Sequence, residues 1–200
     1  MTRRDRPRRI AVEWAAAGLL AVVITVVLAA CGSGDDSPSA GSPSATTSTS
    51  PAPREDFVAE ADDFVNLHQM TKVRGFFADN RLGHLDETLA VANSPDGGKY
   101  PVGTILQLVP QEAMVKRAKG FDPATRDWEF FRLAVSPSGT AIESRGTDDV
   151  VNRFGGSCAS CHSAAETRFD MVCENDHGCE PLPVGHDVFE AIQEADPRPR

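Results

Sequence analysis

A Cys-x-x-Cys-His motif lies close to the C-terminal end of the chain and is formed by Cys158, Ala159, Ser160, Cys161 and His162. Two thiols three positions apart can add to the two vinyl groups of one porphyrin, and the adjacent histidine then reaches the iron from the same side. The motif therefore predicts one covalently bound haem c per chain, with Cys158 and Cys161 as attachment residues and His162 as the iron ligand.

The late position of the motif limits the fold. Only 200 − 162 = 38 residues follow His162, whereas small all-helical electron-transfer cytochromes carry the motif near their start and a methionine ligand some tens of residues later. Met171 follows His162 by 171 − 162 = 9 residues, a separation too short to wrap around to the opposite face of the haem. The four-helix cytochromes c′ also have a late motif, but the strand-like middle of this chain argues against a bundle.

Two other interpretations of the motif are a thioredoxin-like redox pair and half of a zinc site. A redox pair normally lies at a strand-to-helix junction of an α/β fold, and a zinc site needs a second pair of ligands nearby. The adjacent His162 and the export signal described next favour haem.

The N-terminal 30 residues have the pattern of a secretory signal. Five arginines precede an uncharged apolar stretch from Trp14 to Ala30, which corresponds to a basic region followed by a hydrophobic region. The residues around Cys31, Leu28-Ala29-Ala30-Cys31, resemble the lipobox of bacterial lipoproteins, in which the cysteine becomes a lipidated N-terminus. We therefore expect residues 1–30 to be a cleaved lipoprotein signal peptide and Cys31 to anchor the exported protein on the extracytoplasmic face of the bacterial membrane. The alternative is an uncleaved signal anchor.

Composition separates a tether from a folded domain. Residues 31–55 are dominated by Ser, Pro, Gly, Ala and Thr, a composition that cannot bury apolar surface, and we expect a disordered tether. Residues 56–200 are expected to form the haem domain. The formal net charge of −9 argues against a nucleic-acid partner, because an acidic surface repels phosphate.

Periodicity within residues 56–200 predicts an α+β fold. Apolar residues spaced by three or four predict amphipathic helices over 56–68 and 83–93. Short segments rich in β-branched and aromatic residues, separated by Pro and Gly turns, predict antiparallel strands at 103–109, 113–119, 128–135 and 139–143. We therefore expect N-terminal helices, then an antiparallel sheet packing on the haem, then an irregular Cys-containing tail.

The remaining cysteines, Cys173 and Cys179, are close in sequence. The chain has five cysteines, of which one is assigned to lipid and two to haem. In an oxidising compartment the last two are expected to form a disulfide. The alternative is a metal site built from Cys173, His177 and Cys179.

A set of short segments carries a resemblance to a known family. They are Tyr100-Pro101-Val102-Gly103-Thr104, Met114-Val115-Lys116-Arg117, Gly120-Phe121-Asp122, Asp127-Trp128-Glu129-Phe130-Phe131-Arg132-Leu133, and Cys158-Ala159-Ser160-Cys161-His162-Ser163 followed by Asp170. Over about residues 57–172 the chain resembles the cytochrome P-460 family, which includes the β-type cytochromes c′. The resemblance implies a mainly antiparallel sheet over the haem, a homodimer, and five-coordinate iron with an open distal side.

One departure from the family concerns a lysine. Members that oxidise hydroxylamine carry a lysine cross-linked to the porphyrin, expected on the strand after the Tyr-Pro-x-Gly-Thr turn. Residues 103–109 contain no lysine; Lys99 precedes the turn, and Lys116 and Lys119 are placed on the next strand. The chain is therefore closer to the gas-binding members, which have an apolar distal pocket.

The site hypotheses lead to three functions. The first is an open haem that binds or redox-processes small molecules such as NO, with a pocket lined by Leu106, Leu108, Phe76, Phe77 and Phe131. The second is an electron-transfer cytochrome that passes electrons to a membrane redox partner, with His68 or His84 as a sixth ligand. The third is a structural lipoprotein whose motif holds no haem.

Overall fold

A six-stranded antiparallel sheet, with its strands in chain order, forms the centre of the protein. A computed structural model describes residues 55–174 and 176–200. The predicted signal peptide and residues 31–54 of the predicted tether, which include Cys31, therefore lie outside the described residues. The strands are β1 Thr71–Val73, β2 Phe76–Asn80, β3 Thr104–Gln107, β4 Glu112–Lys116, β5 Trp128–Ser136 and β6 Gly139–Gly146.

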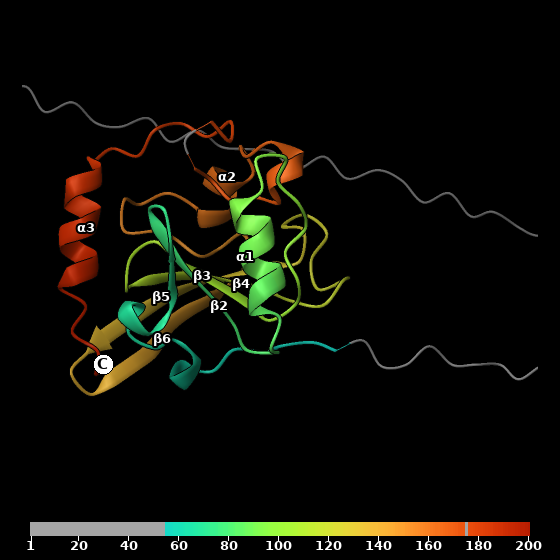
Figure 1. Cartoon of the computed structure of the whole chain (residues 1–200). Helices are drawn as coiled ribbons and strands as arrows, with labels where there is room; N and C mark the ends of the chain where they lie inside the picture. Colours follow the sequence, from blue (N-terminus) through green and yellow to red (C-terminus); the bar gives the residue numbers. More distant parts are fainter. Residues whose placement is uncertain (1–54, 175) are drawn as a thin grey trace, which may run out of the picture. The chain divides into compact units, whose positions relative to one another are not determined.

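Helices complete an α+β fold, as predicted from the sequence. The α-helices are α1 Leu85–Asn93, α2 Cys158–His162 and α3 His186–Glu194, and the 3-10 turns are η1 Ala61–Asp63, η2 Leu67–Gln69 and η3 Thr167–Phe169. In Figure 1, α3 stands apart from α1 and α2, at the left of the view. Within the described ranges, no helix is long and apolar enough to cross a bilayer.

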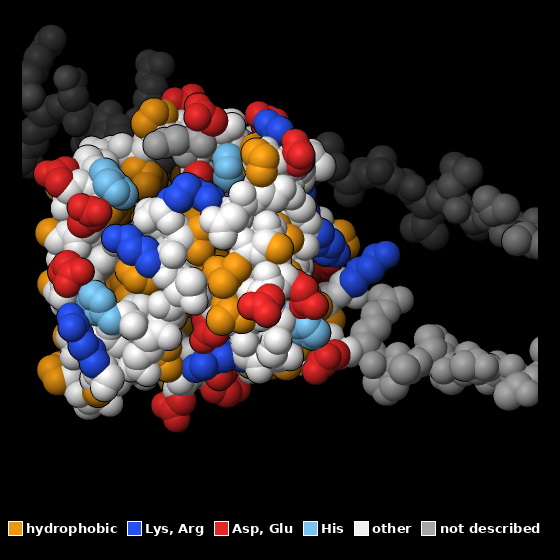
Figure 2. Space-filling model, in the orientation of Figure 1, with side chains coloured by type: hydrophobic (Ala, Val, Ile, Leu, Met, Phe, Trp, Pro, Cys, Tyr) orange, Lys and Arg blue, Asp and Glu red, His pale blue; other side chains and the backbone are white. Residues whose placement is uncertain are grey.

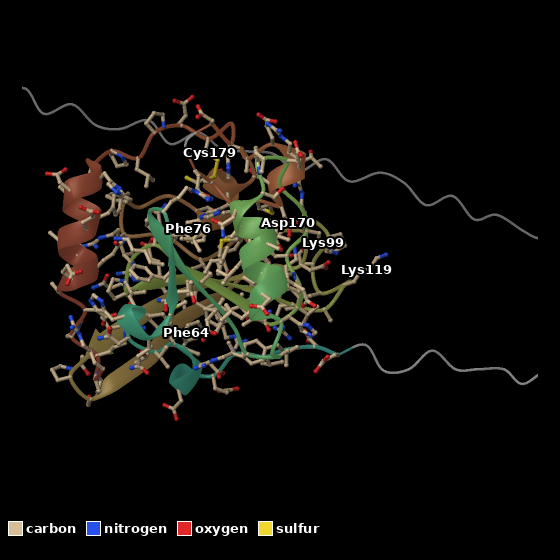
Figure 3. All side chains as sticks on the ribbon, in the orientation of Figure 1. Phe64, Phe76, Lys99, Lys119, Asp170 and Cys179 are labelled. Atoms are coloured by element: carbon tan, nitrogen blue, oxygen red, sulfur yellow. A yellow bond between two sulfur atoms is a disulfide. The ribbon has the colours of Figure 1, made fainter. Side chains whose placement is uncertain are left out.

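The two faces of the sheet bury separate apolar clusters, because successive side chains of a strand point to opposite sides. One face, here the Cys158 face, joins strand residues to Cys158 of α2 and Ala92 of α1. The other, here the Phe64 face, is covered by the segment that contains η1 and η2. Phe76 belongs to the first cluster and Phe64 to the second (Figure 3). The strand residues of the Cys158 face are Val73, Phe76, Ala78, Leu106, Met114, Trp128 and Phe130.

The helix predicted over 56–68 is wrong, because this segment forms two short 3-10 turns instead. Its polar groups bond to distant residues rather than along a helix. The Asp56 carboxylate lies 2.7 Å from the Arg117 guanidinium, and the Leu67 amide donates to the Asp196 carboxylate at 2.9 Å. The Asn66 side chain accepts from the His68 amide and starts η2. Such side-chain bonds to the backbone compete with helix formation.

The central part of the chain agrees with the sequence. The helix predicted over 83–93 is α1, which begins after His84 and ends at Asn93, and the four predicted strands are β3 to β6 with shifted ends. Strand β4 ends at Lys116, so Lys119 lies in a turn and not on the strand. Strands β1 and β2 were not predicted, because β1 is short and β2 ends in polar residues.

The sequence predicts an irregular C-terminal tail, but the tail contains helix α3. The helix begins after Gly185 and buries Phe189 and Gln193, which are spaced by four residues. The Gln193 side-chain amide donates to the carbonyls of Gly75 and Leu108, each at 2.8 Å. These bonds attach α3 to the turn between β1 and β2 and to the end of β3.

A buried ion pair between Asp196 and Arg198 attaches the C-terminal end of the chain to the segment that covers the Phe64 face. The Arg198 guanidinium lies 2.6 Å from the Asp196 carboxylate, and both side chains are nearly inaccessible to solvent. Arg198 also donates to the carbonyl of Phe64 at 2.9 Å. Burial alone raises the pKa of Asp196, but the hydrogen bonds from Arg198 and from the Leu67 amide outweigh burial and hold this pKa below its ordinary value.

We predict that Asp196→Asn lowers the free energy of unfolding at neutral pH by about 3 kcal/mol, because it leaves Arg198 buried without a counter-charge. Since the folded pKa of Asp196 is depressed, its stabilisation is present above the unfolded value of 3.8 and is lost as pH falls through the folded pKa. Denaturant titrations of wild type and variant should therefore converge as the solution is acidified.

The control is Asp187→Asn in the first turn of α3, an exposed carboxylate. Its loss should cost less than about 1 kcal/mol. An equal loss in the two variants would contradict the buried role of Asp196.

Candidate functional site

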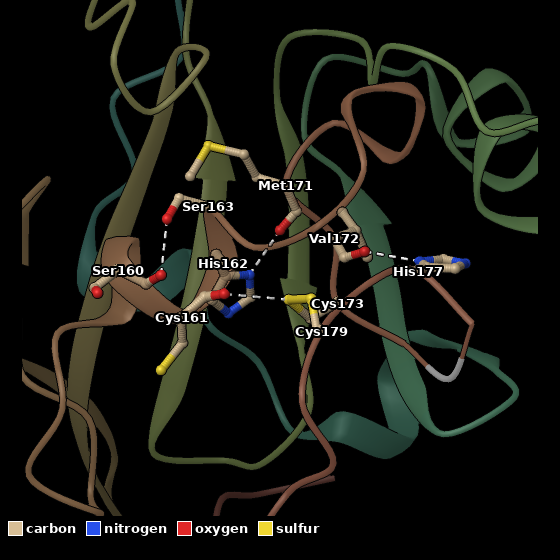
Figure 4. Close-up of a disulfide and its surroundings, with 9 residues drawn as sticks. All are labelled: Ser160, Cys161, His162, Ser163, Met171, Val172, Cys173, His177 and Cys179. Atoms are coloured by element: carbon tan, nitrogen blue, oxygen red, sulfur yellow. Dashed lines mark hydrogen bonds between the residues drawn. A yellow bond between two sulfur atoms is a disulfide. The ribbon is translucent and has the colours of Figure 1, made fainter.

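Helix α2 brings the three motif residues together on a single turn, and Figure 4 shows two of them, Cys161 and His162. Ser157 precedes the helix in an extended conformation, and its side chain accepts from the Ser160 amide at 3.2 Å. The Cys158 amide donates to the carbonyl of Val150 at 2.9 Å, which fixes the start of the helix. Residues three and four positions apart are neighbours on a helix, so Cys158 is adjacent to both Cys161 and His162.

The two motif cysteines are both free thiols in different surroundings. Cys158 is 8% exposed and belongs to the apolar cluster of the Cys158 face, whereas Cys161 is exposed. Burial raises the pKa of the Cys158 thiol to about 11. The helix therefore presents one thiol towards the core and the other towards solvent, and neither is used in a disulfide.

The imidazole of His162 is oriented by a backbone carbonyl. Its Nδ1 lies 2.7 Å from the carbonyl oxygen of Met171, and because a carbonyl can only accept, Nδ1 carries the proton. Burial lowers the pKa of His162, which favours the neutral ring. The Nε2 lone pair is then available to a metal, and the Nδ1–H bond is the outer partner that metal-bound histidines commonly have.

The ring of Phe130 packs against the imidazole of His162. Its centroid lies 5.2 Å from that of His162, and Phe130 is a buried residue of the Cys158 face. In antiparallel register, Phe130 is paired with Met114 of β4. The alternation along β4 could have indicated that Met114 faces the motif, but the sequence alone did not show which face of the sheet would receive α2.

The predicted disulfide between Cys173 and Cys179 is present. The alternative metal site of Cys173, His177 and Cys179 is therefore wrong, because both sulfur atoms are bonded to each other. His177 instead stacks on Phe169 with centroids 3.6 Å apart. Within residues 55–174 and 176–200, no three His, Cys, Asp or Glu side chains are grouped to hold a metal ion.

Three of the five predicted pocket residues lie on the motif's side of the sheet. Phe76 and Leu106 are buried in the Cys158 face, and Leu108 packs against it. Phe77 and Phe131 are on the Phe64 face instead, so their assignment to the pocket is wrong. The reason is the alternation of side chains along a strand, which separates Phe76 from its neighbour Phe77.

The two histidines considered as sixth ligands make their contacts elsewhere. His68 Nε2 lies 3.7 Å from Glu194 of α3, and His84 Nδ1 lies 2.6 Å from Glu87 in the first turn of α1. Neither histidine belongs to the apolar cluster that contains Cys158. The structure therefore does not bring these two residues to the motif.

An open hollow of about 480 Å³ is bounded by three segments of the chain, mostly through charged residues. None of the motif residues lines it. On the face drawn in Figure 2, hydrophobic side chains reach the surface in small groups among charged ones. The lining residues of the hollow are Asp96, Gly98, Lys99, Pro123, Arg126, Asp127, Thr167, Arg168 and Asp170.

The observed donors fit a haem c group by their chemistry. Two free thiols are three positions apart, and a neutral imidazole has its Nδ1 proton engaged. An apolar cluster contains Cys158 and contacts His162 through Phe130. Comparison with known protein families, with curated proteins and with solved structures finds no match to this chain.

We predict that the double variant Cys173→Ala/Cys179→Ala lowers the free energy of unfolding by about 2 kcal/mol, the chain-entropy value for cysteines six positions apart. Denaturant titrations with and without a reductant measure this effect. Reductant should destabilise the wild type and leave the double variant unchanged. Identical wild-type midpoints under both conditions would contradict a structural disulfide.

Proposed function

We propose that this chain is a membrane-anchored, extracytoplasmic mono-haem c-type cytochrome of the cytochrome P-460 and β-type cytochrome c′ kind. Its distal side is open and binds or redox-processes small molecules such as NO or other nitrogen oxides. The observation that carries the proposal is the 2.7 Å contact between His162 Nδ1 and the Met171 carbonyl, made on the same helical turn as two free thiols. A redox pair does not call for a histidine held in this way, and among residues 55–174 and 176–200 no further ligands are grouped to complete a zinc site.

The residues of the chain have separate roles in this proposal. Cys158 and Cys161 hold the haem covalently through thioether bonds, and His162 binds the iron through Nε2. The Met171 carbonyl keeps the imidazole in one tautomer and orientation. The bound haem supplies an iron centre that exchanges one electron and takes a neutral diatomic ligand.

The open distal side is supported by the surroundings of the motif. The other described histidines make contacts elsewhere, as His68, His84 and His186 each lie beside a glutamate and His177 bonds to Val172. The Cys158 face is apolar. Apolar surroundings exclude water and anions and favour neutral ligands such as NO and CO.

A second candidate function is electron transfer through six-coordinate iron, and Met114 is the residue that favours it. Its side chain is buried in the cluster that contains Cys158 and is paired in register with Phe130. A thioether is a known axial ligand of haem c. A low-spin spectrum in both oxidation states that becomes high-spin in Met114→Leu would select this function over the open site.

We predict that the full chain, produced in a bacterium that matures c-type cytochromes, gains the mass of one haem and shows a Soret band that shifts with NO or CO. The variant Cys158→Ala/Cys161→Ala should lose all of the attached haem. The matched control Cys173→Ala/Cys179→Ala should keep it, because those sulfurs form the disulfide. A wild-type chain whose mass contains no tetrapyrrole would refute the proposal.

The histidine assignment has its own matched pair within this experiment. His162→Ala should retain the thioether-bound haem but change the reduced spectrum, because the iron loses its protein ligand. His177→Ala is the control, since His177 Nδ1 also lies 2.7 Å from a carbonyl, that of Val172. An unchanged reduced spectrum in His162→Ala would contradict the assignment.

We also predict that Cys31→Ser moves the protein from the membrane to the soluble fraction, because the acyl chains carried by Cys31 provide the anchoring. Fractionation followed by immunodetection measures the distribution. Ser37→Ala in the same segment is the control and should remain in the membrane. Retention of Cys31→Ser in the membrane would indicate an uncleaved signal anchor instead.

A further inference from the structure

We propose that Asp170 is a positioning residue for the iron ligand, because it holds the carbonyl of Met171 against Nδ1 of His162. The inference rests on the proposed haem function and adds to it the residue that sets the orientation and donor strength of the imidazole. Asp170 is the residue immediately before Met171, is 5% exposed, and does not itself touch His162.

Three buried groups fix Asp170 from different parts of the fold. Its carboxylate accepts from the Tyr100 amide at 2.9 Å and from Lys116 Nζ at 2.7 Å. Its backbone carbonyl accepts from Trp128 Nε1 at 2.6 Å. Strands β4 and β5 thus hold both the side chain and the backbone of one residue.

The backbone conformation of Asp170 explains why three hydrogen bonds are needed to hold it. Asp170 and Met171 both have left-handed backbones, with φ of 51° and 68°. Two consecutive non-glycine residues in this region are strained and persist only where the surroundings enforce them. The left-handed pair turns the chain after η3 and presents the Met171 carbonyl to His162 (Figure 4).

Lys116 links this turn to a second strained turn. Its Nζ donates to the carbonyl of Arg126 at 2.7 Å as well as to Asp170. Arg126 and Asp127 also have left-handed backbones. Lys116 has no exposed surface and lies over the Trp128 ring, 4.8 Å from its centroid. The position of the Met171 carbonyl is therefore set by the sheet rather than by its own loop.

Asp170 acts by holding the position of the Met171 carbonyl and not by its negative charge. Two substitutions that both remove the charge can therefore separate these effects. Asparagine tolerates the left-handed backbone better than other residues and keeps an oxygen that accepts hydrogen bonds. Asp170→Asn should therefore preserve the turn. Asp170→Ala removes the acceptor and places a less tolerant residue in the left-handed region, so the carbonyl of Met171 should move.

The test compares holoprotein variants by resonance Raman spectroscopy of the ferrous iron–histidine stretch and by the reduction potential. In Asp170→Ala the weakened Nδ1–H bond makes the imidazole a poorer donor, so the stretch should shift to lower frequency and broaden, and the potential should become more positive. Asp170→Asn should return both values most of the way to wild type. Lys116→Met should shift both in the same direction as Asp170→Ala.

The matched control is Asp196→Ala, which removes another buried carboxylate, the one paired with Arg198 on the Phe64 face. It should lower the stability but leave the iron–histidine band unchanged. The inference is overturned by an unchanged band in Asp170→Ala, by equal shifts in Asp170→Ala and Asp170→Asn, or by an equal shift in Asp196→Ala.

If Asp170→Ala yields no holoprotein, Lys116→Met decides the question, and an unchanged band in that variant overturns the inference. Absence of haem from the wild-type protein would instead refute the proposed function. The two failures are therefore distinguishable.

Discussion

A buried ion pair between Lys116 and Asp170 joins the sheet to the segment that faces the motif. The charged groups lie 2.7 Å apart, and both side chains are almost fully removed from solvent. Burial lowers the pKa of Lys116, which reflects the cost of holding its charge away from water, and the carboxylate of Asp170 opposes this change. A buried pair is tolerated only where further hydrogen bonds satisfy its members. The Tyr100 amide donates to the Asp170 carboxylate, and the Arg126 carbonyl accepts from Lys116.

The two residues that follow Asp170, Met171 and Val172, each hold a histidine ring through their backbone carbonyl. The Met171 carbonyl faces Nδ1 of His162, and the Val172 carbonyl faces Nδ1 of His177, each at 2.7 Å. Both rings are therefore held in a defined orientation, but their surroundings differ. His162 follows two free thiols and contacts the apolar Cys158 face, whereas His177 lies inside the disulfide loop against Phe169. The hydrogen bond thus orients each ring, and the neighbouring groups distinguish the chemistry open to His162 from that open to His177.

The sequence pattern predicted the elements whose hydrogen bonds join residues close together in the chain. Helix α1 and strands β3 to β6 follow from apolar periodicity and from the Pro and Gly turns between them. Residues 56–68 have a helical periodicity but a different structure, because Asn66 and Leu67 bond to the chain at Asp196 and Arg198, about 130 positions away. The first hairpin is short, and helix α3, although as long as α1, is attached by distant contacts such as the bonds of Gln193 to Gly75 and Leu108.

The sequence by itself determined the chemistry available at the site: the spacing of Cys158, Cys161 and His162, and the disulfide that the remaining cysteines form. Both the motif spacing and the disulfide depend only on how few residues separate the side chains in the sequence. Only the tertiary structure decided that Phe76 faces the motif while Phe77 does not, and that Lys116 pairs with Asp170. The first choice depends on which face of the sheet receives α2, and the second joins residues 54 positions apart, so neither is encoded in any local stretch of the chain.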